Sequence, residues 1–243
     1  MKLTVLGYYG GYPYQGHGTT SYLLQEAGFN LLIDCGSNAV NNLSRVLDPM
    51  DLDAVIISHY HHDHIADLGV LQYYWQLNSG QKKVPILPIY GHTQDPLNYG
   101  SLTLDNVTQG RSYSDLQPLE LGPFTIEFLR TVHPVPTYAM KIKTVDKILT
   151  YTADTDYFPE LVDFAKNSDV LITDSNFASD KTGTKWHMTS TESAKLAKDA
   201  QVDSLIMSHL PQEISHEQIL KEAKSVKNDG QIYLAKDELQ LDI

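Results

Sequence analysis

Four side chains of the metal-ligand type lie within six residues of one another in the segment SHYHHDHIADLG. His59, His61, Asp63 and His64 form the pattern H-x-H-x-D-H directly after the apolar run at 53–58. A lone histidine is usually a hydrogen-bonded core or surface residue, but four such groups have neither an apolar nor a solvated reason to crowd together. Neutral imidazole and carboxylate are donors that zinc prefers. The spacing therefore indicates a metal site.

This element resembles the defining signature of the metallo-β-lactamase superfamily, in which H-x-H-x-D-H stands at the end of a strand. The resemblance extends over nearly the whole chain, because three further residues follow in the family's order and contexts. These are His133 in RTVHPVP, Asp154 in YTADTD and His209 in IMSHL. The resemblance implies an α/β fold, a four-layer αβ/βα sandwich of two mixed β-sheets flanked by helices.

The resemblance also implies two divalent metal ions per chain, expected to be zinc, with manganese or iron as alternatives. In the family, a hydroxide shared by the two ions is the nucleophile, since metal coordination lowers the pKa of water from about 15.7 to about 7. The implied division of ligands is His59, His61 and His133 on one ion, Asp63, His64 and His209 on the other, and Asp154 bridging both.

Residues near these ligands allow more than one interpretation. Asp34 in IDCG resembles the acidic residue that hydrogen-bonds a ligand histidine in this superfamily, and metal sites generally need such outer support. Alternatively, Asp34 is an ordinary turn residue at a strand end. Cys35 is expected to be a small packed side chain, because the ligand set is complete without it. His62, at the variable motif position, and His92, without motif context, are expected to be exposed or, for His62, to support the ligands.

The segment WHMTSTESAKLAKDAQVDSLIMSHL resembles the ribonuclease Z branch of the superfamily, in which a histidine opens an element H-x-T-x-x-x-A ahead of the last metal histidine. His187 begins the corresponding T/S-rich stretch here, 22 residues before His209. The resemblance implies that His187 donates a proton to the leaving oxygen, which typically contributes about 10²–10⁴-fold. His187 thus joins Asp63 as an expected catalytic residue. The alternative is a helix-capping or exposed histidine.

Two departures from that branch argue against a tRNA substrate. Its tRNA-processing members insert a long arm between the third histidine and the bridging aspartate, whereas His133 and Asp154 are only 21 residues apart. The acidic partner expected three residues before that aspartate is replaced by Tyr151, so the orientation of His187 must come from elsewhere. Moreover, phosphate-backbone binders cluster Lys and Arg, and this chain has a net charge of −12. We expect no tRNA partner.

A phosphodiesterase acting on a small phosphodiester, such as a cyclic nucleotide, is the favoured function. Two metals suit that reaction, since they stabilise both the attacking and the leaving oxygen of an in-line displacement. The first alternative is a lactone or thioester hydrolase. His187 separates the two, because a poor alkoxide leaving group needs an acid more than lactone opening does. A metal-dependent binding or sensing protein without catalysis is the alternative of another class, and the complete ligand set argues against it.

The elements that must position these residues alternate between apolar, β-branched runs and helical patterns, as is typical of α/β proteins. A helix is expected from Asp63 to Leu77, and another at 189–201, capped by Thr189 or Ser190. Residues 1–243 are expected to form a single domain of two αβ halves. The range 91–123, rich in Gly, Asn, Thr and Pro, is expected to be a mobile lid or an insertion between the halves.

The composition indicates the cellular location of the protein and the kinds of partner it has. A chain of 243 residues buries enough surface to fold without disulfides, and its single cysteine fits a reducing cytoplasm. The N-terminal stretch is broken by glycines and lacks the apolar core of a signal peptide, and no window approaches the ~20 apolar residues of a membrane span. We expect a cytoplasmic protein with a small-molecule substrate and no membrane partner. Because ribonuclease Z relatives are commonly homodimers, we also expect a homodimer.

Overall fold

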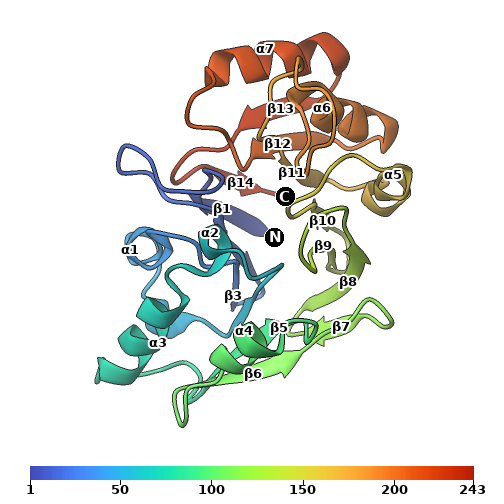
Figure 1. The fold of residues 1–243 in the computed structure, drawn as a ribbon. Helices are drawn as coiled ribbons and strands as arrows, with labels where there is room; N and C mark the ends of the chain where they lie inside the picture. Colours follow the sequence, from blue (N-terminus) through green and yellow to red (C-terminus); the bar gives the residue numbers. More distant parts are fainter. The chain divides into compact units, whose positions relative to one another are not determined.

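The computed structural model describes all residues from 1 to 243 (Figure 1). The chain divides into two compact units. Unit 1 comprises Met1–Ser114 and Lys236–Asp242, and unit 2 comprises Asp115–Ala235 with Ile243. Each unit is built on one seven-stranded sheet that mixes parallel and antiparallel pairs. The predicted α/β class, with two mixed sheets and flanking helices, is therefore confirmed.

The sheet of unit 1 has the strand order β14-β1-β2-β3-β4-β5-β6. Its pairs are antiparallel from β14 to β3 and parallel from β3 to β6. The carboxyl ends of β3, β4 and β5 therefore meet at one edge of this sheet. The strands are β1 (Lys2–Gly7), β2 (Ser21–Glu26), β3 (Phe29–Ile33), β4 (Ala54–Ile56), β5 (Leu87–Gly91), β6 (Thr108–Ser112) and β14 (Gln240–Asp242).

Antiparallel pairing in unit 1 depends on a tight hairpin between β2 and β3. Both loop residues have positive φ, 47° at Ala27 and 80° at Gly28, which matches the right-handed twist of the flanking strands. Alternating apolar side chains of these strands then face a core of fully buried residues that includes Leu23 and Leu32 of the sheet and Trp75 of a covering helix. Burial of this kind stabilises by about 1.5–3 kcal/mol per large apolar side chain.

The single helix expected from Asp63 to Leu77 is wrong, because the structure has two shorter helices there. The backbone N–H of Asp67 donates to the carbonyl of Cys35 at 3.0 Å, whereas an unbroken helix would direct it to Asp63. Close approach of this segment requires Gly36, where a Cβ would lie 2.2 Å from the carbonyl oxygen of Asp63. The helical elements of unit 1 are α1 (Ala39–Leu43), the 3₁₀ turn η1 (Pro49–Asp51), α2 (His62–Ile65), α3 (Leu68–Leu77) and α4 (Pro96–Ser101).

The sheet of unit 2 has the order β13-β12-β11-β10-β9-β8-β7. Pairs from β7 to β10 are antiparallel and pairs from β10 to β13 are parallel, so the carboxyl ends of β10, β11 and β12 lie at one edge. The strands are β7 (Leu119–Leu121), β8 (Phe124–Arg130), β9 (Tyr138–Lys143), β10 (Ile148–Tyr151), β11 (Val170–Asp174), β12 (Ser204–Ser208) and β13 (Gln231–Leu234).

Three helices, α5 (Pro159–Ala165), α6 (Ser190–Asp199) and α7 (His216–Val226), belong to unit 2, and α6 packs beside α7 (Figure 1). Thr189 caps α6, as expected, in a capping box with Glu192: the Thr189 hydroxyl accepts from the Glu192 backbone N–H, and the Glu192 carboxylate accepts from the Thr189 N–H. The range 91–123 contains α4, β6 and β7, and its role as a lid or insertion stays a prediction. None of the helices has the length and apolar character needed to cross a membrane.

Candidate metal centre

In unit 1, the four motif residues follow β4 and open α2. His59 and His64 are fully buried, Asp63 is 8 % exposed, and His62 is exposed, as one of its alternatives predicted. The rings of His59 and His64 lie 4.1 Å apart between centroids, and those of His59 and His61 lie 4.8 Å apart. The His64 Nε2 atom is 3.6 Å from Asp63 Oδ2. The motif therefore folds into one compact set of nitrogen and oxygen donors.

One buried carboxylate orients this set. Asp34 follows β3 with a φ of 54°, a left-handed conformation that Asp tolerates better than most residues. Its Oδ1 accepts from the Ser58 backbone N–H at 2.7 Å, and its Oδ2 accepts from the Ser58 hydroxyl at 2.8 Å. The same Oδ2 lies 2.8 Å from His64 Nδ1, and Ser58 Oγ lies 3.1 Å from His59 Nδ1. Asp34 therefore contacts His64 directly and reaches His59 through Ser58.

Further hydrogen bonds fix the backbone around the motif. The Tyr113 hydroxyl donates to the Ile57 carbonyl at 2.7 Å, and the Tyr60 hydroxyl donates to the His92 carbonyl at 2.7 Å. The expectation that His92 is exposed is wrong: it is 2 % exposed, because it follows β5 and packs against the Tyr60 ring at 4.6 Å. Gly11 donates its backbone N–H to Asp63 Oδ2 at 2.7 Å.

In unit 2, the other predicted ligands come from separate strand ends. His133 follows β8, Asp154 follows β10 and His209 follows β12. The Nε2 atoms of His133 and His209 lie 3.8 and 3.4 Å from Asp154 Oδ2. The 20 residues between His133 and Asp154 contain the β9–β10 hairpin, so no long arm is inserted between them. Topology thus gathers in unit 2 three residues that are far apart in sequence.

Sequence reasoning missed Asp174, the last residue of β11, which lies among these ligands. Its Oδ2 is 2.7 Å from His187 Nδ1, and its Oδ1 is 3.5 Å from His209 Nδ1. Asp174 is therefore the acidic partner of His187, in place of the residue expected at position 151. The available signal was its position: Asp174 ends a strand next to β10 and β12, at the edge where Asp154 and His209 follow theirs.

Asp174 and His187 each stabilise the charged form of the other. Burial alone would raise the pKa of the Asp174 carboxyl, but the imidazoles of His187 and His209 hold that pKa below its usual range. Burial alone would lower the pKa of His187, but the Asp174 carboxylate outweighs it, so the pKa of His187 is raised. The His187 ring also stacks on the His209 ring, with centroids 4.9 Å apart and planes at 18°. The Asp174 carboxylate thus stabilises the protonated form of His187.

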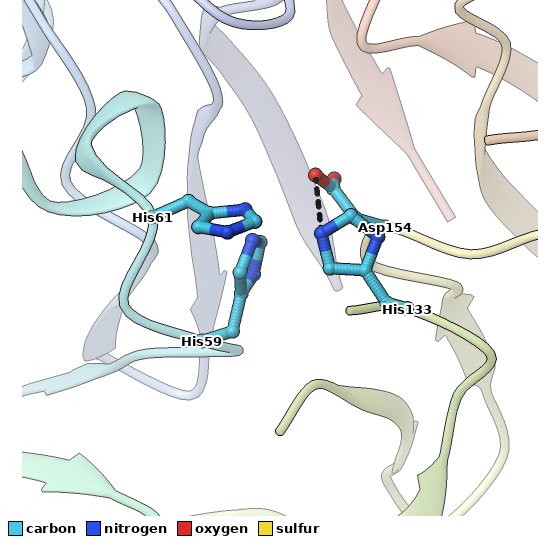
Figure 2. Close-up of side chains that lie close together, drawn as sticks. All are labelled: His59, His61, His133 and Asp154. Carbon is cyan, nitrogen blue, oxygen red and sulfur yellow. Dashed lines mark ion pairs between the residues drawn. The ribbon is translucent and has the colours of Figure 1, made fainter. Parts of the chain in front are cut away.

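The donor chemistry in each unit fits a metal. Figure 2 shows His59 and His61 together on the segment after β4, and His133 paired with Asp154. Outer groups contact the Nδ1 atoms of His64 and His133, namely the Asp34 carboxylate and the Trp186 carbonyl at 3.0 Å, so Nε2 is the atom that could bind a metal. Asp154, Asp174, His187 and His209 offer donor atoms within 4.8 Å of one another. Imidazole nitrogen and carboxylate oxygen suit zinc and related ions.

Comparison with known proteins shows which family the chain matches. Residues 1–233 match the family described as "Anti-Pycsar protein Apyc1". The chain is 44 % identical over 238 residues to the "Probable metallo-hydrolase YhfI" of Bacillus subtilis, with 97 % of each chain covered. It is 32 % identical over 177 residues to the anti-Pycsar protein Apyc1 of a Paenibacillus species, covering 67 % of this chain and 70 % of that one.

Solved structures agree on the fold. The metallo-β-lactamase fold protein YhfI of Bacillus subtilis matches with a TM-score of 0.95 at 43 % identity, covering 99 % of this chain and 98 % of that one. The short form of human tRNase Z matches with a TM-score of 0.77 over 100 % of this chain and 99 % of that one, but at 19 % identity, so this likeness concerns the fold alone. The predicted metallo-β-lactamase fold is confirmed.

Proposed function

The chain belongs to the family of the anti-Pycsar protein Apyc1 and resembles a metallo-hydrolase over almost its full length, and from this premise we propose that it is a binuclear phosphodiesterase. Its substrate is a small phosphodiester such as a cyclic nucleotide. Family membership supports the metal-dependent hydrolase class. The side chains of unit 2 support the choice of phosphodiesters.

In this proposal the chain binds two divalent ions, with zinc as the first expectation and manganese or iron as alternatives. The donor atoms described above support this assignment, since each belongs to a residue type that such ions bind. When bound, two such ions lower the pKa of water and offset the charge on the phosphoryl oxygens. The assigned ligands are His59, His61 and His133 for one ion, Asp63, His64 and His209 for the other, and Asp154 for both.

The contact between His187 and Asp174 is the observation that carries the choice of phosphodiester chemistry. The Nδ1–H group of His187 donates a hydrogen bond to Asp174 Oδ2 at 2.7 Å. In the protonated ring, Nε2–H is then the group that donates a proton to the substrate. His187 Nδ1 is also 3.9 Å from Asp154 Oδ2, so the ring lies beside the bridging ligand. An acid held there serves a poor alkoxide leaving group. Lactone or thioester hydrolysis, the alternative, needs such a donor less.

A panel of substrates tests the function directly. Purified protein loaded with zinc or manganese is assayed with bis-p-nitrophenyl phosphate, cyclic nucleotides, a lactone and a thioester. We expect turnover of the phosphodiesters and the highest kcat/KM for one of the cyclic nucleotides. Turnover confined to the lactone or thioester would replace the phosphodiesterase with its alternative. Metal binding without turnover of any of the four would favour a binding or sensing protein.

Several finer predictions accompany this function. The short β9–β10 connection between His133 and Asp154 and the net charge of −12 favour a small substrate over tRNA. A homodimer and a cytoplasmic location also stay predictions. Tyr73 and Leu77 on α3 are 63 % and 78 % exposed, so they are not core residues, and a subunit contact is one use for them.

A further inference from the structure

Trp186 lies in the segment that joins β11 to α6 in unit 2, and its side chain is 45 % exposed. Single exposed apolar residues are common on protein surfaces, so this exposure alone indicates nothing. What distinguishes Trp186 is that contacts fix the main chain at this residue and the side chains on both sides of it. A flexible loop would allow the indole to fold back onto the protein. Here the main chain is held and the indole is still 45 % exposed.

The residue before Trp186 anchors the segment by charge. Lys185 has a side chain only 10 % exposed, and its Nζ contacts the carboxylate of Asp156 and lies 3.0 Å from Glu192 Oε1. Asp156 comes two residues after the bridging Asp154, and Glu192 belongs to the capping box of α6. Lys185 thus fastens the segment both to the turn that follows β10 and to the first turn of α6.

Trp186 and the residue after it are fastened to the proposed catalytic groups. The Trp186 carbonyl accepts from His133 Nδ1 at 3.0 Å, and His187 pairs with Asp174. The Phe177 ring lies edge-on to the His187 ring with centroids 5.8 Å apart, so aromatic side chains surround the proposed acid. Trp186 is therefore an exposed aromatic residue that directly precedes the proposed proton donor, His187, in the chain. Its carbonyl is hydrogen-bonded to the proposed metal ligand His133.

We propose that Trp186 determines specificity by stacking its indole on the nucleobase of the substrate, which makes that substrate a nucleoside phosphodiester. This inference rests on the proposed function and narrows its substrate class. The metal ligands and His187 serve the phosphodiester group, which every candidate substrate shares. An indole face offers a surface for a flat, uncharged base, and stacking of this kind is worth about 5- to 150-fold in affinity per base. Stacking tolerates any base, so purine and pyrimidine substrates bind alike.

Two substrates that differ only in the base test this inference in the metal-loaded protein. One is adenosine 3′,5′-cyclic phosphate, and the other is ribose 3′,5′-cyclic phosphate, which has the same ring and leaving group without a base. For Trp186→Ala we expect KM for the nucleotide to rise by about 5- to 150-fold and KM for the abasic compound to stay unchanged. Trp186→Phe keeps an aromatic face and should stay within about threefold of the native KM. Val145→Ala, which removes an exposed apolar side chain from the turn between β9 and β10 of unit 2, is the control.

Equal losses on both substrates would overturn the inference, because they would mean that Trp186 acts only through the positions of His133 and His187. An unchanged KM on both would also overturn it. Fluorescence gives a readout independent of turnover, since the chain has two tryptophans and Trp75 is fully buried. Cyclic nucleotide should quench the native protein and not Trp186→Phe. Quenching without hydrolysis of any phosphodiester would refute the proposed function alone, whereas absence of quenching at high nucleotide concentration would refute the stacking.

Discussion

The two units hold their metal-ligand side chains in different ways. In unit 1, four candidate ligands occupy one continuous segment after β4, and a single carboxylate, Asp34, contacts His64 directly and His59 through Ser58. In unit 2, the candidate ligands come from three strand ends, and Asp174 contacts both a candidate ligand and the proposed acid. Unit 1 thus presents candidate metal ligands alone, whereas unit 2 also presents the proposed proton donor. The proposed chemistry is divided unequally between them.

The two units nevertheless share one backbone feature. Asp34, Ala153 and His209 all adopt left-handed conformations, with φ of 54°, 51° and 51°, at the ends of parallel strands. Such conformations cost non-glycine residues roughly 1–3 kcal/mol, and they are found at functional sites where the surroundings enforce them. In each unit the reversal lets a side chain at the edge of the sheet turn toward the ligand cluster. Both units therefore carry local strain where the site is built.

The largest expected effect comes from removing the bridging carboxylate. Asp154→Ala should lower phosphodiesterase activity by about 10³-fold or more, since the metals supply several kcal/mol of charge stabilisation. Metal content measured by elemental analysis should fall for both positions. Asp146→Ala, which removes an exposed carboxylate from the turn between β9 and β10 in the same unit, is the control. Activity that survives in Asp154→Ala with both metals retained would remove the bridging role.

Replacing the proposed acid affects one kind of substrate. His187→Ala should slow phosphodiesters with poor alkoxide leaving groups by roughly 10²-fold, because the departing oxygen then lacks a proton donor. A p-nitrophenyl ester should slow much less, since its leaving group departs without a proton, and metal content should stay unchanged. Steady-state kinetics on both substrates make the comparison within one variant. Equal losses would assign His187 to positioning, and lost metal would make it a ligand, as its place beside Asp154 and His209 allows.

Loss of the orienting carboxylate in unit 1 should lower the affinity for metal. It should not change the preference for leaving groups. Asp34→Asn removes the charge that faces His64 and Ser58, and outer groups of this kind typically contribute about 10–100-fold to metal affinity. Competition with a chelator measures the change. Asp53→Asn, which breaks a pair with Lys83 at 2.6 Å in the same unit, is the matched control. If Asp34→Asn altered only the leaving-group preference, the contrast between the units would be wrong.

The smallest effect concerns how unit 2 holds the segment that carries His187. The Glu222 carboxylate on α7 accepts from the Ser179 N–H at 2.9 Å and from the Ser190 hydroxyl. Burial alone would raise the pKa of Glu222, but these donors and Gln218 lower it. Its stabilisation is therefore complete above the unfolded pKa, about 4.3, and is lost as pH falls through the lowered folded value.

Glu222→Gln should accordingly destabilise the protein by about 1 kcal/mol at neutral pH, less than a fully buried charged hydrogen bond because the side chain is partly exposed. Urea denaturation at pH 7 measures the difference, which should shrink as the pH falls below the unfolded value of about 4.3 and the native carboxyl protonates. A difference that stays constant over this range would mean that charge does not fasten this segment.

The motif of unit 1 could be predicted from the sequence because its candidate ligands lie close together along the chain, in the single pattern H-x-H-x-D-H. Asp174 could not, since nothing in VLITD marks it until strand order brings β10, β11 and β12 side by side. The break between α2 and α3 was missed for a similar reason. Local helical periodicity continues through Asp67, and only the carbonyl of Cys35, distant in sequence, redirects its N–H. Likewise, His92 has no motif context, and burial against Tyr60 depends on tertiary packing.

Metal stoichiometry tests the central claim most directly. Folded protein is loaded with zinc, freed of excess metal and measured by elemental analysis, with His59→Ala treated in parallel. Ligands in both units predict two ions per native chain and about one in His59→Ala, because that substitution removes a ligand from only one position. A native chain that stays folded and binds no metal, or a single ion that His59→Ala leaves in place, would contradict the binuclear centre.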